Sequence, residues 1–76
     1  MMKYQVVFEF QSEDSAMSDV YHCKDGMAAQ DKFLELRDSL AHAVEGSDCN
    51  IIDEPGHYSV IDRKAGIYGY VRLLND

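Results

Sequence analysis

The stretch that decides the fold is residues 25–46, which read DGMAAQDKFLELRDSLAHAVEG. Apolar residues recur in it at steps of three and four, the spacing of one face of an α-helix. The recurring positions are Ala29, Phe33, Leu36, Leu40, Ala43 and Val44. Asp25 suits the N-cap and Gly46 suits the position that ends the helix. The stretch therefore predicts one amphipathic helix, about 20 residues and about 30 Å long, with a stripe that faces the core.

Alternation of side chains near both ends of the chain predicts two β-strands. Residues 3–10 place four apolar side chains on one face, at Tyr4, Val6, Phe8 and Phe10. Residues 67–74 place one set of side chains on one face, at Ile67, Gly69, Val71 and Leu73, and another set on the opposite face, at Tyr68, Tyr70, Arg72 and Leu74. Each strand is expected to bury one face.

Three shorter strands are predicted at residues 19–23, 48–53 and 57–62, of which 48–53 is the least clearly marked. Residues 11–18 are small and polar, which predicts a loop. Residues 54–57, Glu-Pro-Gly-His, fit a type II turn, and residues 63–66 fit a tight hairpin loop that ends in glycine.

The order of elements is therefore β-β-α-β-β-β. A sheet needs one covered face, and one long helix can cover about four strands. We predict an α+β fold, a single antiparallel sheet of four to five strands with one long amphipathic helix packed on one face. Residues 1–76 are expected to form a single small α+β domain. Its core is too small for a deep substrate pocket, so a non-enzymatic role is expected. The order of the strands is left open.

Charge limits the partners that the protein can approach. The chain has 14 acidic and 7 basic residues among 76, and between Glu9 and Glu54 twelve acids stand against three bases. This acidity argues against direct binding of nucleic acid or of anionic membranes, because phosphate groups require clustered Lys and Arg. The sequence shows neither a bilayer-spanning apolar run nor a signal peptide. We expect a cytoplasmic protein in which Cys23 and Cys49 are reduced, although a bridge between them is left open.

A second stripe on the predicted helix is acidic. It lies opposite the apolar stripe and consists of Asp31, Glu35, Asp38, His42 and Glu45. Lys32 and Arg37 flank the apolar stripe instead, so the acidic stripe is predicted to lack a compensating cation. Like charges at this spacing cost roughly 0.2–0.5 kcal/mol per pair. The stripe is either a surface for a basic partner, with Leu34 as an adjacent apolar anchor, or a solvated face that keeps the protein soluble.

An aromatic surface is the second candidate. Tyr68, Tyr70 and Arg72 share one face of the last predicted strand, and Tyr58 is expected to join them from the preceding strand. Tyrosine and arginine are favoured at interfaces because they combine a large contact area with a polar group. The face is interpreted either as an interface of a homodimer or of another complex, or as a surface that its own tyrosines partly cover.

Metal binding and catalysis are weakly supported. His22 and Cys23 are adjacent on a predicted strand and point to opposite faces, so they cannot readily hold one ion together with Cys49 and His57. Adjacent residues on a strand also cannot form a Cys–His catalytic pair. The sequence therefore predicts no catalytic residue, no metal site and no cofactor.

The leading interpretation is a small acidic interaction module that binds a basic surface of a protein partner. Its concrete form is a nucleic-acid mimic from a phage or mobile element, of the anti-restriction or anti-CRISPR type. The partner-binding residues would be Asp31, Glu35, Asp38, Glu45 and Leu34. The alternative is a homodimer, structural or enclosing a small ligand, that pairs through Tyr68, Tyr70 and Arg72.

Overall fold

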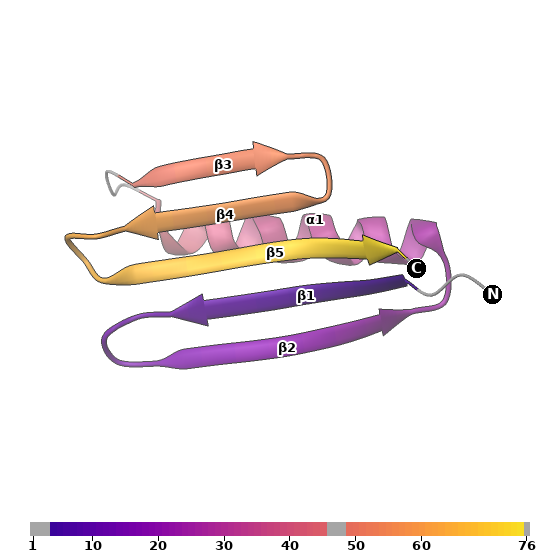
Figure 1. The fold of residues 1–76 in the computed structure, drawn as a ribbon, viewed down its shortest axis with the longest axis horizontal. Coiled ribbons are helices and arrows are strands. Elements are labelled where there is room, and N and C mark those ends of the chain that lie inside the picture. The colour runs from indigo at the N-terminus through magenta and orange to yellow at the C-terminus, as the bar shows by residue number, and fades with distance from the viewer. Residues whose placement is uncertain (1–3, 46–48, 76) are drawn as a thin grey trace.

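The computed structural model describes residues 4–45 and 49–75. Its elements are β1 (Tyr4–Gln11), β2 (Ala16–Cys23), α1 (Gly26–Ala43), β3 (Asn50–Glu54), β4 (His57–Asp62) and β5 (Ile67–Asn75). The strands form one antiparallel sheet in the order β2-β1-β5-β4-β3, and α1 lies across one face of it (Figure 1). The predicted α+β fold, with its β-β-α-β-β-β order, is confirmed.

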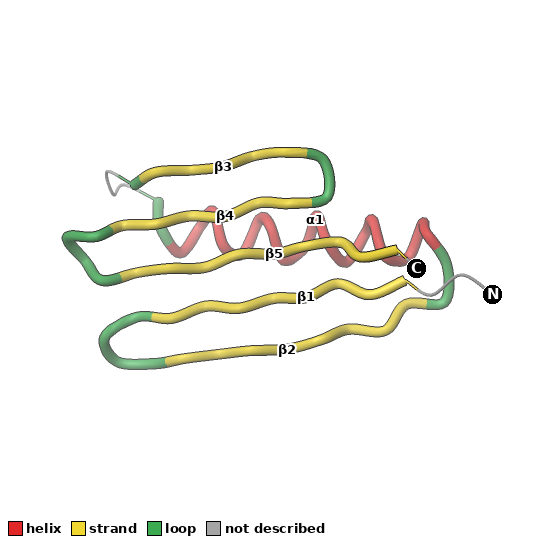
Figure 2. Tube along the Cα trace, in the orientation of Figure 1, coloured by secondary structure: helices red, strands yellow, loops and turns green. Residues whose placement is uncertain are grey.

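The centre of the sheet is the pairing of β1 with β5, the strands that lie furthest apart in the sequence. Val6 pairs with Leu73 and Phe8 pairs with Val71. The other strand pairs are hairpins, whose short loops lie at the two ends of the sheet (Figure 2). Because β1 and β5 alternate most regularly, they place the largest continuous apolar surface in the middle, where α1 covers it.

The helix begins where its sequence predicts. Asp25 is the N-cap, and its Oδ1 accepts a hydrogen bond of 2.8 Å from the backbone N–H of Ala28. A cap of this kind stabilises a helix by about 1 kcal/mol. The helix ends at Ala43, with Val44 as the C-cap. The predicted stop at Gly46 lies outside the described residues.

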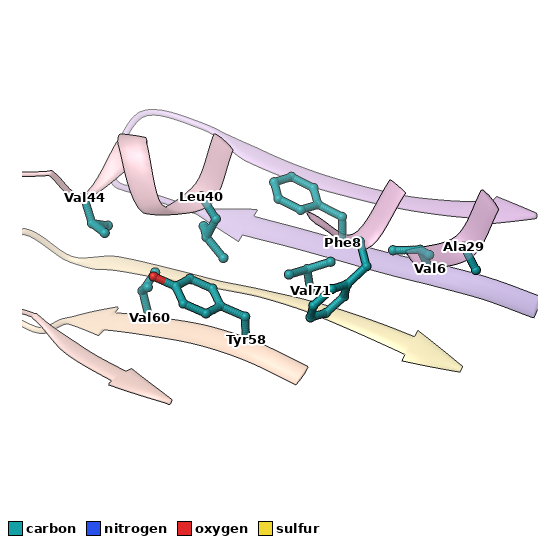
Figure 3. Packing of buried hydrophobic residues seen from close by; sticks show 9 residues of the cluster. Val6, Phe8, Ala29, Leu40, Val44, Tyr58, Val60 and Val71 are labelled. Atoms are coloured by element: carbon teal, nitrogen blue, oxygen red, sulfur yellow. The ribbon is translucent and has the colours of Figure 1, made fainter. Parts of the chain in front are cut away.

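The core lies between α1 and the sheet. Its buried apolar residues are Val6, Phe8, Ala29, Phe33, Leu40, Val44, Tyr58, Val60 and Val71. Figure 3 shows Leu40 and Val44 pointing from α1 toward Val60 and Tyr58 of β4. The predicted helical stripe is confirmed except at Ala43, which is exposed because α1 ends there and Val44 takes the core position.

Two turns contain the glycines that their backbone requires. Gly56, with φ of 74°, ends the Pro55–Gly56 turn, and Gly66, with φ of 68°, ends the loop between β4 and β5. Positive φ is easily adopted by glycine alone. Asp62 closes the second loop, since its Oδ1 accepts hydrogen bonds of 3.1 Å from the N–H groups of Lys64 and Ala65. Both predicted turns are confirmed.

The first loop is shorter than its polar sequence suggests. β2 begins at Ala16, so the connection comprises residues 12–15, closed by a 2.8 Å hydrogen bond from Ser12 N–H to the carbonyl of Ser15. The prediction of a loop over residues 11–18 is therefore wrong at both ends. β2 is an edge strand, and its backbone bonds to β1 hold it although its side chains are mostly exposed.

Candidate functional site

The outer side of α1 carries the acidic stripe. All four of its carboxylate side chains are exposed, with Asp31, Glu35 and Asp38 on α1. The sequence predicts Glu45 on the helix as well, but it follows the C-cap Val44 and lies just beyond the end of α1. Two apolar side chains lie on the same side of the helix, Met27, 77% exposed, and Leu34, 39% exposed. Met27 and Leu34 are seven residues apart, as are Asp31 and Asp38, so each pair lies nearly in line along the helix. We call Met27, Asp31, Leu34, Glu35, Asp38 and Glu45 the outer helix face.

The basic residues of α1 lean toward the sheet, as their positions predict. Lys32 Nζ lies 4.8 Å from the centre of the Tyr21 ring, and the Arg37 guanidinium carbon lies 5.7 Å from the centre of the Tyr58 ring. Arg37 Nη1 also lies 3.9 Å from Asp53 Oδ1 on β3. Their aliphatic stems cover the edges of the core, which leaves the outer helix face negative.

The outer helix face is nevertheless partly compensated, which corrects the expectation that it lacks a cation. Lys32 Nζ lies 3.2 Å from Glu35 Oε2. His42 Nδ1 lies 3.0 Å from Glu45 Oε2, a pair that carries opposite charges only when the imidazole is protonated. Exposed pairs of this kind contribute about 0–1 kcal/mol and are screened by salt. Asp31 and Asp38 form no ion pair with a described residue. These two carboxylates are therefore the ones most available to a partner.

Met27 is a residue that the sequence analysis missed. It precedes the predicted core stripe and belongs to the generally apolar start of the helix, so the stripe pattern does not mark it. The heptad spacing from Met27 to Leu34 would have revealed it, because seven residues return nearly to the same side of a helix.

The second surface is the face of the sheet opposite α1. The pairing of the strands places one row across it as Val20, Val7, Arg72, His57 and Glu54, and the next row as Ser18, Glu9, Tyr70, Ser59 and Ile52. A third row consists of Ala16, Gln11, Tyr68, Ile61 and Asn50. We call this surface the open face. It carries the predicted Tyr68, Tyr70 and Arg72 together.

Tyr58 does not belong to the open face, so the expectation that it joins the other tyrosines is wrong. Tyr58 pairs with Val71 and is buried in the core beneath α1. Paired residues project from the same side of a sheet, so its neighbour His57 takes the place on the open face. The His57 ring stacks on the Tyr70 ring, with centroids 6.4 Å apart and planes at 15°.

Hydrogen bonding fixes the centre of the open face. The Tyr70 hydroxyl donates a hydrogen bond of 3.0 Å to Glu9 Oε2. This bond to the Glu9 carboxylate raises the pKa of Tyr70, and burial of the ring raises it further. His57, Tyr68, Tyr70 and Arg72 line a shallow hollow of about 240 Å³ beside it. The pKa of Tyr58 is raised as well, chiefly by burial and then by the Asp53 carboxylate.

Among residues 4–45 and 49–75, no cluster of three His, Cys, Asp or Glu side chains is arranged to hold a metal ion. Cys23 lies in one edge strand and Cys49 directly precedes the other, so four strand spacings of about 4.8 Å separate them. A disulfide needs Cα atoms within about 7 Å, so the two thiols cannot bridge within one chain.

Comparisons with protein-family models, with curated proteins and with solved structures found no match to this chain. Among the described residues, no helix is both long enough and apolar enough to cross a bilayer.

Proposed function

We propose that the protein is an interaction module that presents the outer helix face to a basic surface on a protein partner. The observation that supports this most directly is the exposure of Met27 and Leu34 on the same side of α1 as Asp31 and Asp38. A surface that served solubility alone would need the charges but not the apolar side chains.

The two kinds of side chain contribute differently to such a complex. Carboxylates steer a basic partner toward the surface and raise the rate of association. Apolar anchors that become fully buried supply most of the binding energy in typical interfaces. Met27 adds adaptability, because its unbranched thioether side chain fits irregular pockets. The outer helix face combines both contributions.

A nucleic-acid-binding protein is the partner class that we propose, with the outer helix face in place of phosphates. Three of the carboxylates lie on α1 itself, and from Asp31 to Asp38 the helix axis advances about 10 Å, at about 1.5 Å per residue. One strand of B-DNA carries a phosphate about every 3.4 Å of axis, or about three phosphates over that length. Because Lys32 pairs with Glu35, the three carboxylates leave a net charge of about −2, roughly two thirds of the charge of one strand. This density favours a partner that contacts a few phosphates of one strand over one that grips both strands.

This proposal needs no cofactor and no catalytic residue. It places the protein in the cytoplasm, where such partners act and where Cys23 and Cys49 stay reduced.

The test is capture of a partner by the tagged protein at low and at high salt, with the captured proteins identified by mass spectrometry. We expect a nucleic-acid-binding protein that is released as salt rises, because exposed charges are screened within about 10 Å at 0.1 M ionic strength. The double variant Glu35→Lys/Asp38→Lys should lose this partner while its circular dichroism spectrum stays unchanged. Met27→Ser/Leu34→Ser should weaken capture at both salt concentrations.

A matched control separates position from net charge. Glu13→Lys/Asp14→Lys changes the net charge by the same amount in the exposed loop between β1 and β2. It should retain the partner. Equal loss in both double variants would show that only bulk charge matters, and unchanged capture by Glu35→Lys/Asp38→Lys would refute the proposal.

A further inference from the structure

The open face is more apolar than a solvent-facing sheet surface needs to be. Four of its large side chains are well exposed, Val20 at 52%, Ile52 at 48%, Tyr68 at 41% and Leu74 at 37%. Val7 and Ile61 lie between them and are half-buried. The strand pairing divides these six side chains into two apolar groups on either side of the centre, Val20, Val7 and Leu74 in one and Tyr68, Ile61 and Ile52 in the other. Exposed apolar groups of this kind are typical of a protein–protein contact.

Two opposite charges are placed diagonally at the centre of this face. Val7 pairs with Arg72, and Glu9 pairs with Tyr70, so these four side chains occupy the corners of one small rectangle. Arg72 forms no ion pair with a described residue. Glu9 uses Oε2 to accept from Tyr70, which leaves Oε1 available to a second donor.

We propose that the open face binds the open face of a second copy of this chain, with the strands of the two sheets crossing at about 70°. A two-fold axis along the diagonal through Val7 and Tyr70 exchanges the other two corners. Arg72 of each copy then lies opposite Glu9 of the other copy, and the Val7 and Tyr70 side chains each meet their own equivalents. The same rotation brings no two like charges of the three paired rows face to face.

The hollow supports this arrangement. It is lined by His57, Tyr68, Tyr70 and Arg72. Arg72 forms no ion pair with a described residue, so a carboxylate that enters from the second copy would meet an unpaired guanidinium. The His57 and Tyr70 rings, which stack on each other, form part of the lining.

The area of the face suits a weak dimer. Strands lie about 4.8 Å apart and rise about 3.4 Å per residue, so strands of 8, 8, 5, 6 and 9 residues present about 600 Å² of flat area. Two copies that overlapped completely would bury about 1,200 Å², the lower limit for a stable specific interface. The molecule measures 43 × 21 × 16 Å and is longest along the strands (Figure 1), so crossed faces overlap only around their centres, and we expect a weak dimer.

Charge exchange tests the arrangement by sedimentation equilibrium from micromolar to near-millimolar concentration. The wild-type chain should dimerise. Glu9→Arg and Arg72→Glu should each raise the dissociation constant at least about tenfold, because each places like charges opposite one another twice. Glu9→Arg/Arg72→Glu should restore it to within about threefold of the wild-type value, since the pairing is re-formed with exchanged signs.

Matched controls carry the same charge changes elsewhere. Glu13→Arg and Lys64→Glu alter exposed loop residues and should leave dimerisation unchanged. A wild-type chain that stays monomeric over the whole range would overturn the proposal, as would dimerisation that resists both single changes. Failure of the double variant to recover would overturn it too, provided that circular dichroism shows it folded. None of these variants alters the outer helix face, so the result is independent of the proposed partner.

Discussion

The two sides of β5 carry different kinds of residue although they alternate along one strand. On the side under α1 lie Gly69 and Val71, both buried, and on the open face lie Tyr68 and Arg72, both exposed. The residues of β5 on the covered side are small because α1 approaches this side closely. The open face holds large amphipathic side chains that no described segment of the chain covers. The comparison teaches that one side of the sheet is packed against the helix, whereas the other is the surface for which we propose contact with a second copy.

Removing a core side chain should produce the largest effect and separate the two sides most clearly. Leu40→Ala should lower the free energy of unfolding by about 2–5 kcal/mol, because Leu40 is almost fully buried against the sheet. Leu74→Ala, on the open face, should cost less than about 1 kcal/mol. Urea denaturation followed by circular dichroism, at a concentration where the chain is monomeric, measures both.

Because Leu40→Ala removes much of the stability of so small a chain, Leu40→Val provides a graded check. It should cost about 1 kcal/mol. Equal costs at Leu40 and Leu74 would contradict the difference between the two sides.

Gly69 tests how closely the helix approaches the covered side. A Cβ atom at this position would lie 2.6 Å from Leu40 Cδ1, closer than two carbon atoms can approach. Gly69→Ala should therefore destabilise by about 1–3 kcal/mol, whereas glycine-to-alanine changes inside regular structure are otherwise stabilising by about 0.5–1 kcal/mol. The double variant Leu40→Ala/Gly69→Ala should be more stable than the sum of the single costs predicts, because the shortened side chain leaves room for the new methyl group.

Gly26→Ala is the matched control, since a Cβ atom there would lie at an ordinary 3.4 Å from the Tyr4 ring. It should change the free energy of unfolding by less than about 1 kcal/mol. If the cost of Leu40→Ala/Gly69→Ala equals the sum of the two single costs, the contact between Leu40 and a Cβ atom at position 69 does not limit the packing.

The smallest effect is expected from the two tyrosines whose pKa is raised, one on each side of the sheet. The pKa of Tyr58 is raised first by burial, whereas that of Tyr70 is raised first by the hydrogen bond to Glu9. Glu9→Ala should therefore lower the pKa of Tyr70 and leave that of Tyr58 unchanged. Ultraviolet titration, with Tyr70→Phe and Tyr58→Phe to assign each step, measures this; an equal shift at both tyrosines would contradict the separate causes.

The same shifts determine the dependence of stability on alkaline pH. A tyrosine whose pKa is higher in the folded than in the unfolded chain contributes stability that is fully present below about pH 10. That contribution is lost as pH rises through the folded pKa. Tyr70→Phe should accordingly make the free energy of unfolding less dependent on pH above about 10.

Several features of this protein follow from the sequence alone. The spacing of Phe33 and Leu40 determines which side of α1 faces the core, and the alternation in β1 and β5 determines which of their residues are buried. Asp25 determines where the helix begins. These features depend on the local geometry of 3.6 residues per turn and two residues per pleat, which the side chains of one segment reveal.

Other features were decided only by the tertiary structure. The pairing of β1 with β5 joins the two ends of the chain, and no local pattern specifies such a contact. In β4, both alternating sets of side chains contain apolar residues, with Tyr58 and Val60 on one face and Ile61 beside His57 on the other. The pattern therefore does not decide which face carries Tyr58. Only its pairing with Val71 assigns its side. β2 is an edge strand that backbone hydrogen bonds to β1 hold in place. Because its side chains contribute little to this pairing, its polar start lacks the sequence pattern that predicts a strand. The ion pair of Lys32 with Glu35 depends on the direction of a flexible side chain, which spacing does not determine.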